Sequence, residues 1–79
     1  MNFEVRIPQQ GFATEEVTIL KWLKEVGDDI REGEPLYEME SEKASLEVES
    51  LVSGKLVSII IQKGNAAAIG EVVALIETE

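Results

Sequence analysis

Short runs of alternating apolar and polar residues make up most of this chain, and Gly, Asp or Asn residues separate the runs. Phe3, Val5 and Ile7 alternate as the side chains of a half-buried strand do. Residues 15–25 come nearest to a helical pattern, but their β-branched and aromatic side chains favour a strand. The pattern predicts an all-β chain with strands near 2–7, 16–25, 29–31, 35–41, 44–50, 53–62, 67–69 and 72–77.

An internal repeat relates the two halves of the chain. Gly27 matches Gly64 and Gly33 matches Gly70, and both pairs are 37 residues apart. Further pairs at this spacing are Ile19 with Leu56, Trp22 with Ile59, Asp28 with Asn65, Glu34 with Glu71, Leu36 with Val73, and Met39 with Ile76. One half cannot bury its own apolar face, so we expect both to pack together. The predicted fold is a flattened barrel or sandwich of two four-stranded antiparallel sheets with pseudo-two-fold symmetry.

The matched glycines are expected to serve structural turns. Asp or Asn directly after Gly27 and Gly64 is typical of a tight turn. Gly33 and Gly70 are expected to adopt positive φ, which glycine reaches without a steric penalty.

The segment LYEMESEKASLEVES, residues 36–50, predicts a hairpin with a two-residue turn at Glu42 and Lys43. This register places Met39 opposite Leu46, Tyr37 opposite Val48, Glu38 opposite Glu47, Glu40 opposite Ser45, and Ser41 opposite Ala44. Apolar side chains then share one face and acids the other. A slip of one residue would destroy this separation, so the register is well specified.

Two features of this hairpin oppose simple stability. Glu-Lys is a poor two-residue turn compared with Asn-Gly or Asp-Gly. Like charges at Glu38 and Glu47 cost up to ~1 kcal/mol when they face each other across strands. Local rules are often broken where function intervenes. The residues alone leave two interpretations open for Lys43: a solvated turn lysine, or an exposed amine that carries a function.

Composition narrows the classes of function. The 79 residues suffice for one domain, residues 1–79, which buries only ~60% of its unfolded surface. The chain has no Cys and no His, which excludes disulfides, the usual zinc ligand sets and His-activated nucleophiles. We therefore expect no metal and no catalytic residues. The net charge of −9 argues against nucleic acid or an anionic membrane as partner.

Location and assembly are inferred from what the sequence lacks. No apolar run approaches transmembrane length, and the first residues show no targeting pattern. We expect a cytoplasmic location, or the mitochondrial matrix if the source is eukaryotic, and a monomeric domain.

Over nearly its whole length the chain resembles the lipoyl domain of 2-oxo acid dehydrogenase acyltransferase components. The family pattern has a Gly sixteen residues before a lysine and a Gly eleven residues after it, here Gly27 and Gly54 around Lys43. The G-D and G-E-P-L segments, the acid-Lys-Ala turn and IPQQG also match. The resemblance implies that Lys43 bears covalent lipoic acid, that Glu42 and Ala44 are inspected by attaching enzymes, and that Gly54 serves a structural turn. The family usually has Asp at the position of Glu42.

The resemblance also implies a role. Such a domain is a carrier and no enzyme: its swinging arm, on the order of 15 Å long, shuttles acyl groups and electrons. The implied partners are a 2-oxo acid decarboxylase, an acyltransferase catalytic domain, a dihydrolipoamide dehydrogenase and a lipoate-attaching enzyme. The parent chain would be a dihydrolipoamide acyltransferase. The G-E-P-L and E-S-E-K-A segments look more like pyruvate or acetoin systems than 2-oxoglutarate ones.

Three alternatives stay open. Biotin carriers share the fold and the hairpin lysine but typically flank it with methionines. The glycine-cleavage carrier resembles ESEKAS but is longer. An unmodified sandwich that serves as a structural adaptor would need no lysine at the hairpin tip.

Overall fold

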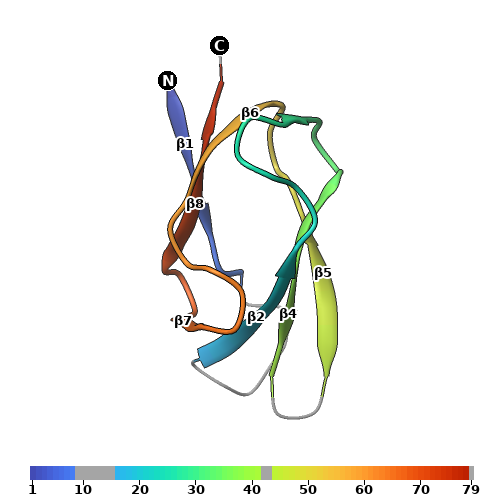
Figure 1. Ribbon diagram of the computed structural model, residues 1–79, viewed down its shortest axis with the longest axis vertical. Coiled ribbons are helices and arrows are strands. Elements are labelled where there is room, and N and C mark those ends of the chain that lie inside the picture. Colours follow the sequence, from blue (N-terminus) through green and yellow to red (C-terminus); the bar gives the residue numbers. More distant parts are fainter. Residues whose placement is uncertain (9–15, 42–43, 79) are drawn as a thin grey trace.

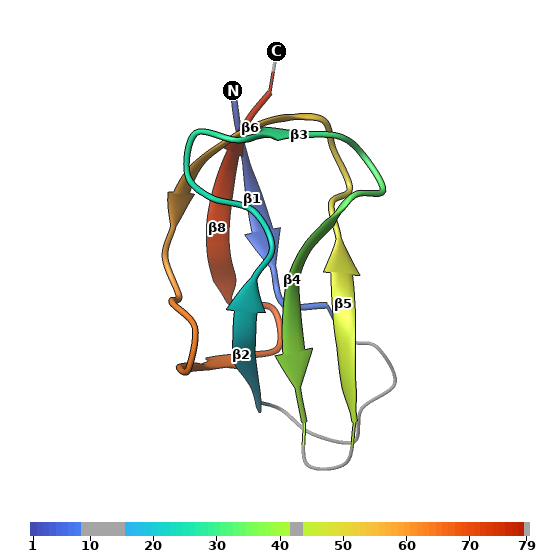
Figure 2. The ribbon, with the colours of Figure 1, turned by 45° about the vertical axis from the view of Figure 1, so that its right-hand side comes forward.

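The computed structural model describes residues 1–8, 16–41 and 44–78, and in these ranges every regular element is a strand. Figures 1 and 2 show two sheets packed face to face, with both termini at one end and the β4–β5 hairpin at the other. The strands are β1 (Asn2–Arg6), β2 (Glu16–Trp22), β3 (Asp29–Ile30), β4 (Pro35–Glu40), β5 (Ser45–Glu49), β6 (Gly54–Ile59), β7 (Ala66–Ala68) and β8 (Val72–Glu77). The described residues hold no helix long and apolar enough to cross a membrane.

The strand order confirms the predicted two-sheet architecture. One sheet, called the β8 sheet, has the order β1-β8-β6-β3, and the other, called the β4 sheet, has the order β5-β4-β2-β7. All pairings are antiparallel. The two orders become the same when β1 is matched with β5, β8 with β4, β6 with β2 and β3 with β7. The repeat in the sequence is thus a pseudo-two-fold relation between the sheets.

Backbone hydrogen bonds join each half to the other at equivalent places. The N–H of Gly27 donates to the carbonyl of Leu56, and the N–H of Gly64 donates to the carbonyl of Ile19, both at 2.7 Å. These two glycines have φ of 100° and 86°, a conformation that a Cβ would strain. Because each turn is bonded to a strand of the opposite half, neither half is complete without the other.

Strands β2 and β6 end earlier than the sequence predicts. The predicted strands 16–25 and 53–62 end at residues 22 and 59 in the structure. The N–H of Asp28 donates to the carbonyl of Glu25, and the N–H of Asn65 donates to that of Gln62, so each chain segment has already turned. The local turn therefore outweighs the β propensity of the preceding residues.

The core lies between the sheets and follows the repeat. Both β4 and β8 bury their second, third and fifth residues, and register shifts in the β4–β5 and β1–β8 pairings let two consecutive side chains point inward. The buried apolar residues are Val5, Ile7, Val17, Ile19, Ile30, Leu36, Tyr37, Met39, Val48, Leu56, Ala67, Val73, Ala74 and Ile76.

The cores of the two halves differ at Tyr37, which the repeat matches with Ala74. The Tyr37 ring packs on Trp22 with 4.8 Å between ring centroids, and Trp22 Nε1 donates to the carbonyl of Ile61 at 2.9 Å. The Tyr37 hydroxyl is buried and has no hydrogen-bond partner among the residues that the structure describes. Burial raises the pKa of Tyr37, so the hydroxyl stays neutral.

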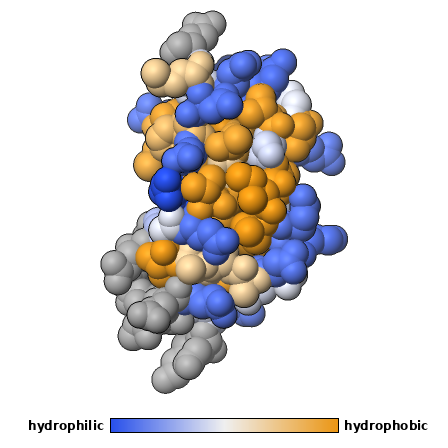
Figure 3. All heavy atoms as spheres, turned by 90° about the vertical axis from the view of Figure 1, so that its left-hand side faces the viewer, coloured by the Kyte–Doolittle hydropathy of each residue, from blue (hydrophilic) through white to orange (hydrophobic). Residues whose placement is uncertain are grey.

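The outer faces of the two sheets also differ in chemistry. On the β4 sheet, Lys21 and Glu38 pair across β2 and β4, whereas the repeat places Ser58 and Leu75 there on the β8 sheet. Figure 3 shows the side of the molecule that bears the β8 sheet, where hydrophobic side chains gather between hydrophilic ones. The charged side chains of the hairpin region are therefore not a requirement of the fold, since the equivalent face of the other half lacks them.

Candidate functional site

The predicted register of the β4–β5 hairpin is confirmed. Its cross-strand pairs are Tyr37 with Val48, Glu38 with Glu47, Met39 with Leu46, and Glu40 with Ser45. Beyond the last pair, the N–H of Ser41 donates to the carbonyl of Ala44 at 2.9 Å. The two strands of the hairpin are thus hydrogen-bonded up to Ser41 and Ala44, and only two residues connect them. These two, Glu42 and Lys43, lie outside the described residues.

The base of the hairpin is fixed by packing. Tyr37 and Met39 are fully buried and Val48 is 8% exposed, so the inward face of both strands is part of the core. Strand β4 also bonds to β2 on its other side, which makes it an interior strand of its sheet. The end of the hairpin is therefore presented from a rigid base, as a site on regular structure is placed more precisely than one on a loose loop.

Small side chains border the closed end of the hairpin. Ala44 and Ser45 are exposed and Ser41 is half-buried. Ala44, one of the predicted flanking residues, accordingly lies on the accessible surface. Side chains of this size do not sterically hinder a large group attached at the hairpin end.

The outward face of the hairpin is acidic. Glu40, Glu47 and Glu49 are exposed, and Glu38 is half-buried. Lys21 on β2 places its Nζ 3.6 Å from Glu38 Oε2 and offsets one of these charges. The remaining acids give this end of the molecule a negative potential, which favours partners with a basic surface.

The predicted turn glycines lie away from the hairpin end, and their roles are structural. Gly33 and Gly70 have φ of 88° and 87°, as predicted. Gly27 shares this left-handed conformation. Gly54 corrects the expectation of a turn: it begins β6, and a Cβ there would run into the backbone oxygen of Glu77. Gly54 is needed because two strands approach closely.

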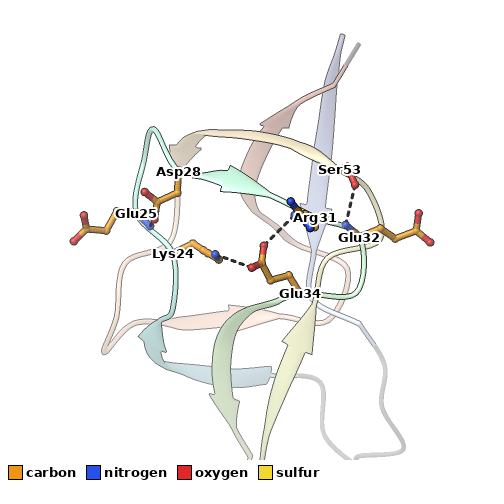
Figure 4. Close-up of polar contacts among 7 residues, drawn as sticks. All are labelled: Lys24, Glu25, Asp28, Arg31, Glu32, Glu34 and Ser53. Atoms are coloured by element: carbon orange, nitrogen blue, oxygen red, sulfur yellow. Dashed lines mark hydrogen bonds and ion pairs between the residues drawn. The ribbon is translucent and has the colours of Figure 1, made fainter.

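A polar cluster stabilises the turns on either side of β3 (Figure 4). Glu34 accepts from Lys24 Nζ and from the N–H of Arg31, both at 3.0 Å. These contacts, the Lys24 hydrogen bond above all, lower the pKa of Glu34. In the second half Glu71 accepts from the N–H of Ala68 at 2.8 Å. The matched acids of the repeat thus cap equivalent turns.

Sequence reasoning did not find the lysine partner of this cluster. The repeat gives no signal for it, because Ile61 stands where the first half has Lys24. The cluster is a structural element: its donors and acceptors are used within the turns. In the described ranges no group of three or more His, Cys, Asp or Glu side chains could hold a metal ion.

One family model and several curated proteins match this chain over nearly its whole length. The family model Biotin_lipoyl, described as "Biotin-requiring enzyme", matches residues 3–76. The dihydrolipoyllysine-residue succinyltransferase component of the 2-oxoglutarate dehydrogenase complex of Bartonella vinsonii subsp. berkhoffii is 36% identical over 77 residues, which are 98% of this chain and 19% of that protein. The dihydrolipoyllysine-residue acetyltransferase component of the Staphylococcus aureus (strain Mu50) pyruvate dehydrogenase complex is 35% identical over 77 residues, 98% of this chain and 18% of that protein. The chain thus spans about a fifth of the length of these curated relatives.

Two solved structures share the fold. The lipoyl domain of the Azotobacter vinelandii 2-oxoglutarate dehydrogenase complex superposes with a TM-score of 0.77 at 20% identity, covering 95% of both chains. The urea carboxylase of Kluyveromyces lactis superposes with a TM-score of 0.81 at 22% identity, covering 98% of this chain and 6% of that enzyme. At these identities the likeness concerns the fold alone.

Proposed function

Because this chain belongs to the biotin- and lipoyl-attachment family, we propose that it is a lipoyl carrier domain and that Lys43 bears the lipoyl group. One observation carries the choice of lysine: the confirmed hairpin register leaves two residues, Glu42 and Lys43, between the hydrogen-bonded Ser41 and Ala44. The names of the two curated relatives support lipoate over biotin, since each name refers to a dihydrolipoyllysine residue.

The residues around the hairpin end fit an attached arm better than an enclosed cofactor. Ala44 and Ser45 are exposed, and neither of them lines the groove between β1 and β5 or the hollow beside β3. When bound, the lipoyl group supplies a disulfide that can be reduced and acylated. The protein supplies the Lys43 amine, holds it on a rigid hairpin, and surrounds it with an acidic surface that partners can recognise.

As a carrier, the chain acts on no substrate itself. It is the substrate of a lipoate-attaching enzyme, then of a decarboxylase, an acyltransferase catalytic domain and a dihydrolipoamide dehydrogenase. Tethering to one assembly raises the effective concentration of the arm at each of these sites. We propose that the parent chain is a dihydrolipoamide acyltransferase, since the relatives are acyltransferase components about five times longer.

The acyl group of the parent complex remains a prediction of the sequence. A succinyltransferase and an acetyltransferase are 36% and 35% identical to the chain, so identity favours neither. The resemblance of the G-E-P-L and E-S-E-K-A segments to pyruvate or acetoin systems is the argument for a short acyl group. Reductive acylation of the lipoylated domain by a pyruvate decarboxylase component and by a 2-oxoglutarate one, compared by kcat/KM, decides between them.

Intact mass tests the modification itself. The chain is expressed with lipoate and a lipoate-attaching enzyme, and separately with biotin and a biotin-attaching enzyme. One lipoyl group per chain is expected in the first preparation and the unmodified mass in the second. Biotinylation without lipoylation would establish a biotin carrier, and no adduct in either preparation would leave the adaptor interpretation standing.

A further inference from the structure

A groove of about 440 Å³ lies between β1 and β5, away from the hairpin end. Each of these strands is the outermost strand of its sheet, so each has one edge without a strand neighbour in the described fold. The pseudo-two-fold symmetry of the sheets relates the two strands, which also share one pattern of burial along their lengths. The groove is lined by Phe3, Val5, Arg6, Ile7, Pro8, Leu36, Glu47, Val48, Glu49, Ser50 and Leu51.

The two walls of the groove differ in charge. On β1, Arg6 forms an ion pair with Glu4 at 2.6 Å and also donates to the carbonyl of Gly70 at 2.8 Å, so its charge is offset. On β5, Glu47 and Glu49 are exposed, and neither forms an ion pair with any described residue. Under the pseudo-two-fold symmetry, Glu49 on β5 occupies the position of Arg6 on β1, so a negative charge stands where β1 has a positive one. The β5 wall therefore carries two unbalanced negative charges.

Apolar side chains form the interior of the groove and part of its mouth. Val5, Ile7 and Val48 reach it from the core, all less than a tenth exposed. Leu51, at the end of the β5 wall, is 74% exposed, although contact with water is unfavourable for a leucine side chain. An exposed leucine beside an apolar groove provides a contact point for a partner's apolar side chain.

We propose that this groove binds an extended segment of a partner protein, with alternating basic and apolar residues, that adds as a strand to the outer edge of β5, where no described strand pairs. A segment in this position has its main-chain groups paired with those of the edge strand. Its apolar side chains lie beside Val48 and its basic side chains lie opposite Glu47 and Glu49, because alternate residues of a strand point to opposite faces. A second copy of the chain does not fit this wall, because its net charge is −9. The site is independent of any group on Lys43.

A short blocked peptide of alternating valine and lysine tests the site on the whole chain. A matched peptide has glutamate in place of lysine. Titration followed by amide NMR signals is expected to shift residues of β5 and Leu51 with the lysine peptide only. The double variant Glu47→Gln, Glu49→Gln is expected to weaken binding by at least about fivefold, since each cross-strand ion pair contributes to the free energy of binding.

The control double variant is Glu38→Gln, Glu40→Gln, which removes the same charge from β4, outside the groove. It should change affinity by less than about twofold, because Lys21 already offsets the charge of Glu38 and neither Glu38 nor Glu40 lines the groove. Circular dichroism confirms that both variants fold. Equal weakening by the two double variants, equal binding of the glutamate peptide, shifts outside the groove, or no binding would each overturn the proposal. Concentration-dependent dimerisation with shifts in β5 would assign the edge to a second copy and also overturn it.

Discussion

Glu38 and Glu47 lie directly opposite one another on β4 and β5, near the closed end of the hairpin. Lys21 places its Nζ 3.6 Å from Glu38 and only partly offsets the repulsion between the two carboxylates. The repeat shows that the fold does not require this arrangement, because Leu75 occupies the position of Glu38 in the second half. The hairpin thus keeps an acidic surface at some expense of stability.

Glu47→Gln should therefore stabilise the domain, by up to ~1 kcal/mol, because it removes one of two facing like charges. The free energy of unfolding in urea measures the gain, which should shrink in about 1 M salt, where the Debye length falls to about 3 Å. Glu49→Gln is the matched control, since Glu49 faces Pro35 rather than an acid. Equal gains in the two variants would show that net charge, and not the facing pair, is responsible.

Tyr37→Phe should also stabilise the domain. The Tyr37 hydroxyl is buried and no described residue bonds to it, and an unpaired buried group costs on the order of 1 to 3 kcal/mol. The variant keeps the ring that packs on Trp22 and removes only the oxygen. The urea midpoint is expected to rise with an unchanged m-value. A lower midpoint would mean that the hydroxyl has a partner in solution, such as a buried water.

Gly54→Ala should destabilise the domain more than Gly33→Ala. At Gly54 a Cβ would meet the backbone oxygen of Glu77 and would lie 2.9 Å from Ile76 Cγ2, so strands must move, at a cost of at least about 2 kcal/mol. At Gly33 nothing lies within 4 Å, and only the left-handed φ is strained, which costs about 1 kcal/mol. Thermal and urea unfolding rank the two. A larger loss of unfolding free energy for Gly33→Ala than for Gly54→Ala would contradict the close approach of β6 and β8.

The Glu34 cluster should make stability depend on pH. The pKa of Glu34 is lowered in the folded state, so its ionised form favours folding at pH values above the ordinary glutamate pKa of about 4.3. This contribution is lost as the pH falls through the lowered, folded-state value. Glu34→Gln should therefore flatten the fall in unfolding free energy between about pH 5 and about pH 3.

Glu71→Gln is the control for that measurement. Glu71 caps the equivalent turn through the N–H of Ala68, but Ile61 stands where Lys24 lies in the first half. If Glu71→Gln flattened the pH dependence as much as Glu34→Gln, the Lys24 contact would not be the main cause.

The sequence predicts the features that depend on local pattern and on the repeat. Alternation alone set the hairpin register, because a slip of one residue would expose Met39 and bury Glu38. The repeat predicted the two-sheet architecture and the positive φ of Gly33 and Gly70. These predictions succeeded because each needs only one strand, one turn, or the symmetry between halves.

Features that depend on contacts between distant segments could not be predicted. The close approach at Gly54 involves Glu77, and the unpartnered Tyr37 hydroxyl depends on how the opposite sheet packs against it. The groove between β1 and β5 arises from the placement of two sheet edges, which neither strand encodes alone. Lys43 lies outside the described residues, so its attachment role stays a prediction.

We expect the lipoate-attaching enzyme to select Lys43 by its position in the hairpin. Exchanging the turn residues, Glu42→Lys with Lys43→Glu, keeps composition, net charge and hairpin length. The buried anchors Tyr37, Met39 and Val48 are unchanged, so the fold should persist, as circular dichroism can confirm. Lipoylation is expected to slow by at least ~100-fold, since a misplaced reacting group carries a steep penalty. A similar rate would mean that the enzyme accepts any lysine in this acidic surface.

Peptide mapping of the lipoylated domain tests the claim most directly. After modification of the wild-type chain, mass spectrometry of proteolytic fragments locates the adduct among Lys21, Lys24, Lys43, Lys55 and Lys63. One lipoyl group is expected, on Lys43, and none on the other four. An adduct on any of those four, with Lys43 unmodified, would contradict it.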